Sequence, residues 1–251
     1  MNGNHTQWID NMEKKKQIID SIRQALKEHG DPKARASSAR FFKADESPKV
    51  YGVRAVEVRK IAKKGLKQLK PIAKQELFEI CEELWKTGYL EEAFIACFWA
   101  ESQRTLYEPA DFLIFERWVQ NHLSNWADCD TLCNHTIGSF LMKYPRYLEE
   151  LKRWTTSTNR WVKRAAAVSL IIPARKGLFL ETIFDIADRL LLDEDDLVQK
   201  GYGWMLKSAS EAHQEEVFQY VMKHKALMPR TALRYAIEKM PPELKAKAMK
   251  K

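Results

Sequence analysis

The sequence predicts an all-α fold in which pairs of helices stack into a solenoid with one concave surface. Apolar residues recur at helical spacing along most of the 251 residues, and no window alternates as a β-strand does. Only 9 glycines and 9 prolines are present, which disfavours an all-β fold with many tight turns. Three helical segments also resemble one another at intervals of 36 and 31 residues, and this favours stacked helix pairs over a simple bundle.

Charge and cysteine content limit the classes of function. The chain carries 42 basic and 34 acidic residues, a net charge of +8, so a polyanion is the first candidate partner. Its 4 cysteines form no CxxC motif and have no histidine at metal-ligand spacing, and we expect no metal and no cofactor. The N-terminal segment lacks the apolar stretch of a secretory signal, and no apolar run reaches membrane-spanning length. We therefore expect a cytoplasmic protein with buried, reduced thiols.

The predicted helices follow one another with short breaks. Residues 6–29 are an amphipathic helix ended by Gly30-Asp31-Pro32, a second helix covers 34–42, and residues 44–53 are the longest loop. Further helices are expected at 75–87, 91–104, 110–121, about 125–143, 146–155, 160–172, 178–192, 195–208, 212–224, 229–239 and 242–250. We expect one domain over 1–251, with N-terminal helices (1–43), a repeat core (54–240) and a basic C-terminal helix (241–251).

Basic residues are grouped along the chain. Eight of them lie between Arg54 and Lys74 with only Glu57 opposing, a pattern that fits backbone phosphates but is more often a solvated face. Residues 151–180 hold seven basic residues and no acidic one, and residues 181–196 are acidic. This separation predicts that one edge meets a polyanion while the other faces water.

The stretch around Trp126 and Asp130 is the candidate site. Ser124 and Asn125 are suitable N-cap residues, and a helix that starts there places Trp126 and Asp130 on one face. Asp130 also adjoins an apolar stripe, where a lone carboxylate is costly unless it is paired or used. The alternative is structural: Trp126 belongs to the core and Asp130 caps or pairs locally.

Two later helices repeat the combination of a tryptophan and a nearby charge. Trp161 precedes Arg164 by three residues, and Trp204 precedes Lys207 by three. An indole can pack on a sugar while the cation holds a phosphate, although core packing is the simpler explanation for Trp161. Two glycines, at 201 and 203, lie inside the helix that carries Trp204 and predict close approach of a backbone or a ligand.

An ordered set of motifs between about Arg40 and Pro242 resembles the AlkD-type DNA alkylation repair family, the HEAT-like-repeat DNA glycosylases. The motifs that carry the resemblance are Arg40-Phe41-Phe42-Lys43, Tyr51-Gly52-Val53-Arg54, Asn125-Trp126-x-x-x-Asp130, Trp161-x-x-Arg164, Arg175-Lys176-Gly177, Gly203-Trp204-Met205-Leu206-Lys207 and the segment 228–239. The resemblance implies a superhelical solenoid of HEAT-like antiparallel helix pairs with a concave basic groove. It also implies a monomer that acts on duplex DNA containing alkylated purines.

Roles follow from the resemblance residue by residue. The catalytic aspartate of the family falls on Asp130, and its two active-site tryptophans fall on Trp126 and Trp204. Two DNA-contacting arginines fall on Arg164 and Lys207, and a lysine weakens the bidentate grip on phosphate. An aromatic residue that contributes to the site in some family members falls on Phe41. The remaining residues expected to contact DNA are Arg40 and Lys43, beside Phe41, and Trp161 and Lys163, beside Arg164.

The function implied is a DNA glycosylase of base excision repair that removes N3- or N7-alkylated purines such as 3-methyladenine and 7-methylguanine. Such purines carry a positive charge and leave without a general acid, so one carboxylate at Asp130 can stabilise the sugar cation and position water. Some family members have lost the catalytic set, and its retention here argues for activity. The alternative is a non-catalytic HEAT-repeat protein that binds damaged or distorted DNA, and a third reading is a protein-interaction scaffold.

Overall fold

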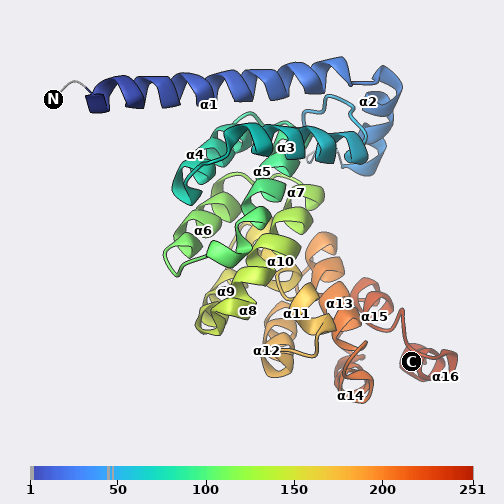
Figure 1. Ribbon diagram of the computed structural model, residues 1–251. Coiled ribbons are helices and arrows are strands. Elements are labelled where there is room, and N and C mark those ends of the chain that lie inside the picture. Colours follow the sequence, from blue (N-terminus) through green and yellow to red (C-terminus); the bar gives the residue numbers. More distant parts are fainter. Residues whose placement is uncertain (1–2, 44–45, 47, 251) are drawn as a thin grey trace. The chain divides into compact units, whose positions relative to one another are not determined.

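The computed structural model describes residues 3–43, 46 and 48–250, and these form α-helices, short 3₁₀-helices and a π-helix without a β-sheet (Figure 1). The prediction of an all-α protein is confirmed for this part of the chain. None of the helices described there is long and apolar enough to cross a membrane. The chain packs as two compact units, residues 1–107 and residues 108–251.

In the first unit α5 packs against α4, and α3 packs against both α1 and α5. Trp99 of α5 is buried at this contact and donates its indole N–H to the Ala62 carbonyl at 2.8 Å. Gly65 permits the close approach, because a Cβ at this position would lie 3.0 Å from both Ile22 and Trp99. The helical elements of the unit are α1 (Gly3–Glu28), α2 (Pro32–Ser38), η1 (Ala39–Phe41), α3 (Ala55–Leu69), α4 (Lys74–Trp85), α5 (Leu90–Ser102) and η3 (Arg104–Leu106).

A buried carboxylate fixes the loop that leads into α3. Glu91 of α5 accepts hydrogen bonds from the backbone N–H groups of Tyr51, Gly52 and Val53 at 3.0, 2.8 and 3.0 Å. The adjacent Glu92 accepts a bond from the Tyr51 hydroxyl at 2.7 Å. These bonds satisfy loop N–H groups that belong to neither helix nor strand. The start of α3 is therefore set by its contact with α5.

The second unit is built around α13, which packs against α10, α11, α12 and α15. Helices α10, α13 and α15 are the three segments that resemble one another in sequence, and α13 packs against both of the others. Their side-by-side order confirms the predicted succession, while the solenoid remains a prediction. The elements are α6 (Asp111–Asn121), α7 (Trp126–Thr131), the π-helix η4 (Leu132–Ile137), α8 (Gly138–Lys143), η5 (Pro145–Tyr147), α9 (Leu148–Trp154), α10 (Arg160–Val168), α11 (Ile171–Arg175), α12 (Leu180–Leu190), α13 (Asp196–Ala209), α14 (Gln214–His224), α15 (Arg230–Ala236) and α16 (Pro242–Met249).

Two helices predicted as single elements are divided in the structure. The segment expected as one helix from about 125 to 143 consists of α7, η4 and α8, with a π-helix in the middle. The helix expected over 160–172 ends at Val168, and α11 begins at Ile171. Pro173 explains this break, because it has no N–H to donate and its ring would clash with the Ser169 carbonyl of a continuous helix.

All four cysteines are free and buried, as their positions on apolar helix faces predict. The burial of the Cys129 thiol raises its pKa, with a further contribution from the neighbouring Cys133. Burial likewise raises the pKa of the Cys81 thiol, so both thiols stay protonated at neutral pH.

Candidate active site

Asp130 lies near the end of a short helix whose start is fixed by an N-cap. The side-chain oxygen of Asn125 accepts the backbone N–H groups of Ala127 and Asp128, both at 3.0 Å, and the side-chain amide donates to Asp128 Oδ2 at 2.5 Å. Because the first turn is fixed, Trp126 and Asp130 lie one turn apart on the same side of α7. The N-cap prediction is confirmed for Asn125.

The π-helix η4 begins two residues after Asp130. A π-helix accommodates more residues per turn than an α-helix, and such segments occur frequently at functional sites. Its wider turn changes the direction of every side chain that follows relative to a regular helix. The irregularity therefore sets the direction of the residues that follow Asp130, and the apolar spacing of this segment does not reveal it.

Arg164 of α10 holds the Asp130 carboxylate in a bidentate ion pair. Its Nε donates to Oδ1 and its Nη2 to Oδ2, each at 2.9 Å, a geometry that fixes both oxygens. The Asp130 side chain is 15% exposed and Arg164 is 5% exposed. Burial raises the pKa of Asp130, and the charge and hydrogen bonds of Arg164 offset part of that rise. Burial alone would lower the pKa of Arg164, but Asp130 outweighs it and the pKa of Arg164 is raised.

Arg164 also reaches the helix that carries Trp204. Its Nη1 donates to the Leu197 carbonyl in the first turn of α13 at 2.5 Å. Gly201 leaves room for this side chain, because a Cβ there would lie 3.3 Å from the Arg164 Cγ and 3.5 Å from Nη1. One buried guanidinium thus connects α7 with α13. The Arg164 guanidinium is therefore buried between these helices, and its place on a concave DNA-binding surface stays a prediction.

The tight contact between α13 and α15 is made by Gly203, the residue before Trp204. Trp126 and Trp204 are both half-buried. Next to Trp204, Gly203 faces Ala232 and Tyr235, and a Cβ on it would lie 2.9 Å from the Ala232 carbonyl oxygen and 2.7 Å from the Tyr235 Cβ. The predicted close approach to a backbone is confirmed at Gly203, whereas Gly201 is approached by a side chain.

The other predicted DNA-binding residues of this unit have partners within the protein. Lys207 donates to Glu238 at 2.9 Å, lies 5.4 Å from the centre of the Tyr235 ring, and its side chain is 14% exposed. Lys163 forms an ion pair with Asp193. Trp161 is 8% exposed, in agreement with its interpretation as a core residue.

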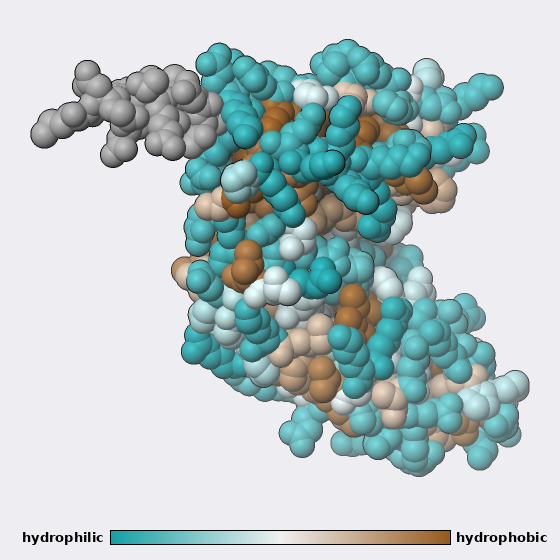
Figure 2. Space-filling view, in the orientation of Figure 1, coloured by the Kyte–Doolittle hydropathy of each residue, from teal (hydrophilic) through white to brown (hydrophobic). Residues whose placement is uncertain are grey.

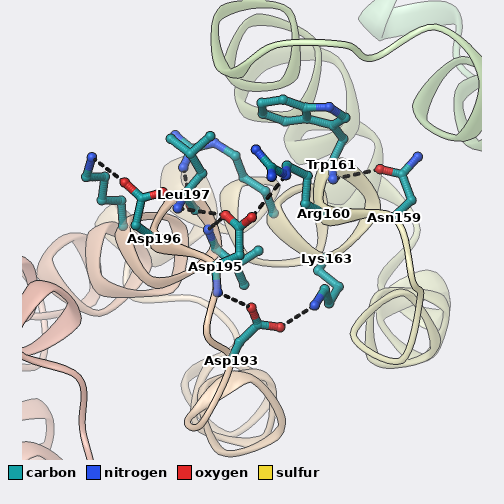
Figure 3. Close-up of polar contacts among 11 residues, drawn as sticks. Asn159, Arg160, Trp161, Lys163, Asp193, Asp195, Asp196 and Leu197 are labelled. Carbon is teal, nitrogen blue, oxygen red and sulfur yellow. Dashed lines mark hydrogen bonds and ion pairs between the residues drawn. The ribbon is translucent and has the colours of Figure 1, made fainter. Parts of the chain in front are cut away.

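Acidic residues before α13 pair with basic residues of α10, as the close-up shows (Figure 3). Asp195 accepts the backbone N–H of Leu197 at 2.9 Å as the N-cap of α13, and it also pairs with Arg160 Nε at 3.0 Å. Asp193 accepts the Asp195 N–H at 3.0 Å and pairs with Lys163. The prediction that this acidic segment faces water on an edge away from the basic one is wrong. Charges that are separated in sequence neutralise one another in the folded unit.

The comparison with protein families decides the identity of the chain. A family described as DNA alkylation repair enzyme matches residues 22–240. This chain belongs to the DNA alkylation repair enzyme family. The fold agrees, because the chain is similar to a solved structure described as a predicted DNA alkylation repair enzyme from Enterococcus faecalis, with a TM-score of 0.74 at 17% identity. The similarity covers 85% of this chain and 98% of the other. A comparison with curated proteins gave no significant match.

Three more residues that the DNA alkylation repair family resemblance selects lie in the first unit. Arg40 and Phe41 belong to η1, and Lys43 follows it. All three side chains are exposed, and Phe41 is 68% exposed. Asp130, Arg164, Trp126 and Trp204 belong to the second unit. A role in DNA binding for the residues of η1 therefore stays a prediction.

Several residues that shape the site have no role in the sequence-based prediction. The Leu197 carbonyl, Asp193 and Asp195 orient or neutralise residues of α10, and Tyr235 with Glu238 holds Lys207. Asp195 could have been found as an N-cap, because it precedes an apolar helix. The other contacts join segments about 30 residues apart and have no local signal. Among the described residues, no group of three His, Cys, Asp or Glu side chains is arranged to bind a metal.

Proposed function

We propose that this member of the family is a DNA glycosylase that hydrolyses the N-glycosidic bond of cationic N3- or N7-alkylated purines in duplex DNA. The observation that carries the proposal is the Asp130 carboxylate, fixed by both of its oxygens and still partly exposed, on the same helix face as Trp126. A carboxylate held in one orientation is suited to stabilise positive charge that develops at a defined place.

The chemistry needs little more than this anion. The bond between the sugar and the purine nitrogen breaks, and its electron pair neutralises the positive charge of the base, so the base leaves without receiving a proton. The sugar becomes oxocarbenium-like and faces the Asp130 anion. A water oxygen then bonds to the anomeric carbon, and Asp130 accepts the proton that this water releases. Indole rings at Trp126 and Trp204 add cation–π attraction to the same developing charge.

In this mechanism Arg164 is a positioning residue. Its fork holds both oxygens of Asp130 and its third bond goes to the Leu197 carbonyl, so the carboxylate keeps one orientation before substrate binds. Preorganisation of this kind avoids the cost of reorienting the carboxylate during the reaction.

The alternative function is non-catalytic binding of damaged or distorted DNA. It is favoured by the same ion pair, because a buried carboxylate neutralised by arginine is also a common structural element. The two functions differ in one observable. A glycosylase releases free 7-methylguanine and leaves an abasic site, and a binding protein does neither.

The experiment compares wild type with Asp130→Asn on methylated duplex DNA under single-turnover conditions. Asparagine is nearly isosteric and uncharged, so we expect excision to fall by about 10²–10³, the usual loss for one electrostatic partner of a transition state. Asp20→Asn, at an exposed position of α1, is the matched control for the charge change and should excise normally. Equal rates for wild type and Asp130→Asn would remove Asp130 from the mechanism, and no release by wild type would favour the binding protein.

A second substrate tests the absence of a general acid. Uracil is a neutral base and leaves poorly without protonation, so wild type should release 7-methylguanine much faster than uracil from matched duplexes. Rapid uracil release would show that another residue protonates the leaving base.

A further inference from the structure

The positive charge of the chain is concentrated in one short segment. Residues 54–70 contain seven basic residues and one acidic residue, a net charge of +6 in a chain whose total is +8. The other 234 residues therefore contribute only +2. This segment consists of α3 together with the residue that precedes it and the residue that follows it.

The helical period places this charge on one side of α3. The residues buried against the core are Val58, Ala62, Gly65 and Leu69, which share one face. Lys60 and Lys67 project from the opposite face, and Lys63 and Lys64 lie on either side of them. Arg59 lies at the edge of this group, where its guanidinium packs over the Phe98 ring of α5 at 4.2 Å, and Lys70 extends the group past the helix end. We call these six exposed residues the α3 basic face. Hydrophilic side chains cover the region of α3 in the space-filling view (Figure 2).

Most of the α3 basic face is not neutralised by acidic residues. Lys60 pairs with Glu57 at 2.7 Å. Lys63, Lys64, Lys67 and Lys70 form no ion pair within the described part of the chain. The contrast with the second unit is clear, because the basic residues near the candidate site there have acidic partners: Arg160, Lys163, Arg164, Lys200 and Lys207.

We infer that the α3 basic face binds the phosphate backbone of duplex DNA and supplies much of the non-specific affinity of this protein. The inference rests on the proposed function only in taking duplex DNA as the partner. From Arg59 to Lys70 the α3 basic face extends about 16 Å along the helix axis, which matches roughly five base-pair steps of about 3.4 Å. An extended row suits a polyanion, whereas a small anion needs donors that converge on one point.

A membrane surface fits α3 less well than DNA does. An amphipathic helix binds a membrane by burying its apolar face among the lipids. The apolar face of α3 already packs in the core of the first unit, and Val56 is the large apolar residue exposed on the helix. Apart from Val56, the described residues of α3 therefore offer no exposed large apolar side chain to insert beside the cations.

The test compares two triple variants with the same change in net charge. Lys63, Lys67 and Lys70 are replaced by Gln in one variant, and the exposed Lys14, Lys16 and Lys27 of α1 are replaced by Gln in the control. Dissociation constants for unmodified and methylated duplexes are measured from low to physiological salt. Each lost phosphate contact reduces the magnitude of the slope of log K against log salt by about 0.9, so the slope of the α3 variant should be smaller by up to about 2.7. At low salt we expect this variant to bind roughly ten- to a hundredfold more weakly than wild type.

The outcomes separate the inference from the proposed function. The control should keep the wild-type slope, and equal losses in both triples would mean that only bulk charge matters and would overturn the inference. An unchanged slope in the α3 variant would overturn it as well, as would loss of binding to anionic vesicles without loss of DNA binding. If wild type binds DNA but excises nothing, the proposed function fails, and the slopes still decide whether α3 contacts the backbone. Thermal melting of each variant shows that it is folded.

Discussion

The Asp130 carboxylate leads to a prediction about pH. Burial raises its pKa above the usual value of about 3.9, even though Arg164 lowers it in part. The anion is the form that stabilises a sugar cation, so excision falls when the pH drops through this raised pKa. We expect the acid limb of the single-turnover rate of 7-methylguanine release to lie at a higher pH than the pKa of a free aspartate, after subtraction of uncatalysed loss. A limb at or below the pKa of a free aspartate would contradict the prediction.

A substitution at Arg164 distinguishes a residue that positions Asp130 from one that contacts a DNA phosphate. Arg164→Lys keeps the charge but replaces a planar fork with a single point donor, which loses the simultaneous grip on Asp130 and the Leu197 carbonyl. We expect excision at saturating DNA to fall by up to about 100-fold, the cost of a misplaced reacting group, while DNA affinity changes less. A variant with intact excision and a flattened salt slope would instead make Arg164 a phosphate contact.

Two glycines of α13 give a matched pair at the scale of the element. In Gly203→Ala the new Cβ meets the Ala232 carbonyl of α15 at 2.9 Å, and a backbone atom cannot move away without separating the two helices. We expect a loss of about 1–3 kcal/mol in the free energy of unfolding.

The partner substitution is Gly201→Ala, where the new Cβ meets the Arg164 Cγ at 3.3 Å. A side chain can shift by a few tenths of an ångström, and alanine favours the helix by about 1 kcal/mol, so the net change in the free energy of unfolding should be small. Urea unfolding of both variants checks the pair. Equal destabilisation would show that the contact with α15 is not what distinguishes the two positions.

At the scale of the whole molecule, the net charge of +8 predicts salt-sensitive binding to duplex DNA without sequence preference. Backbone phosphates are the same in unmodified and methylated duplexes, so the slope of log K against log salt should be equal for both. Titrations of two unrelated sequences, each with and without 7-methylguanine, measure this. Binding that does not respond to salt between low and physiological concentrations would contradict it.

Much of the candidate site could be located from the sequence, but not its internal contacts. The helix that carries Trp126 and Asp130 and its cap at Asn125 are local features, and the structure agrees with them. Arg164 was found as a site residue, yet its partner was expected to be DNA. Its observed partners are Asp130, 34 residues away, and Leu197, 33 residues away. Contacts at that distance depend on how helices pack, which no single segment encodes.

The sequence alone determined that the chain is helical, where most helices begin and end, that α10, α13 and α15 are related, and that the run from Arg54 to Lys74 is almost entirely basic. The helices follow from periodicity and capping within about 20 consecutive residues, and the relation among the three segments follows from comparing them along the chain. Only the tertiary structure decided which charges are already paired. Asp193 and Asp195 neutralise basic residues of α10 because α10 packs beside α13, whereas no acidic side chain in the described part of the chain pairs with Lys63, Lys64, Lys67 or Lys70. The sequence gives the position of every charged residue, but whether a basic residue is neutralised by an acidic one depends on packing between distant segments.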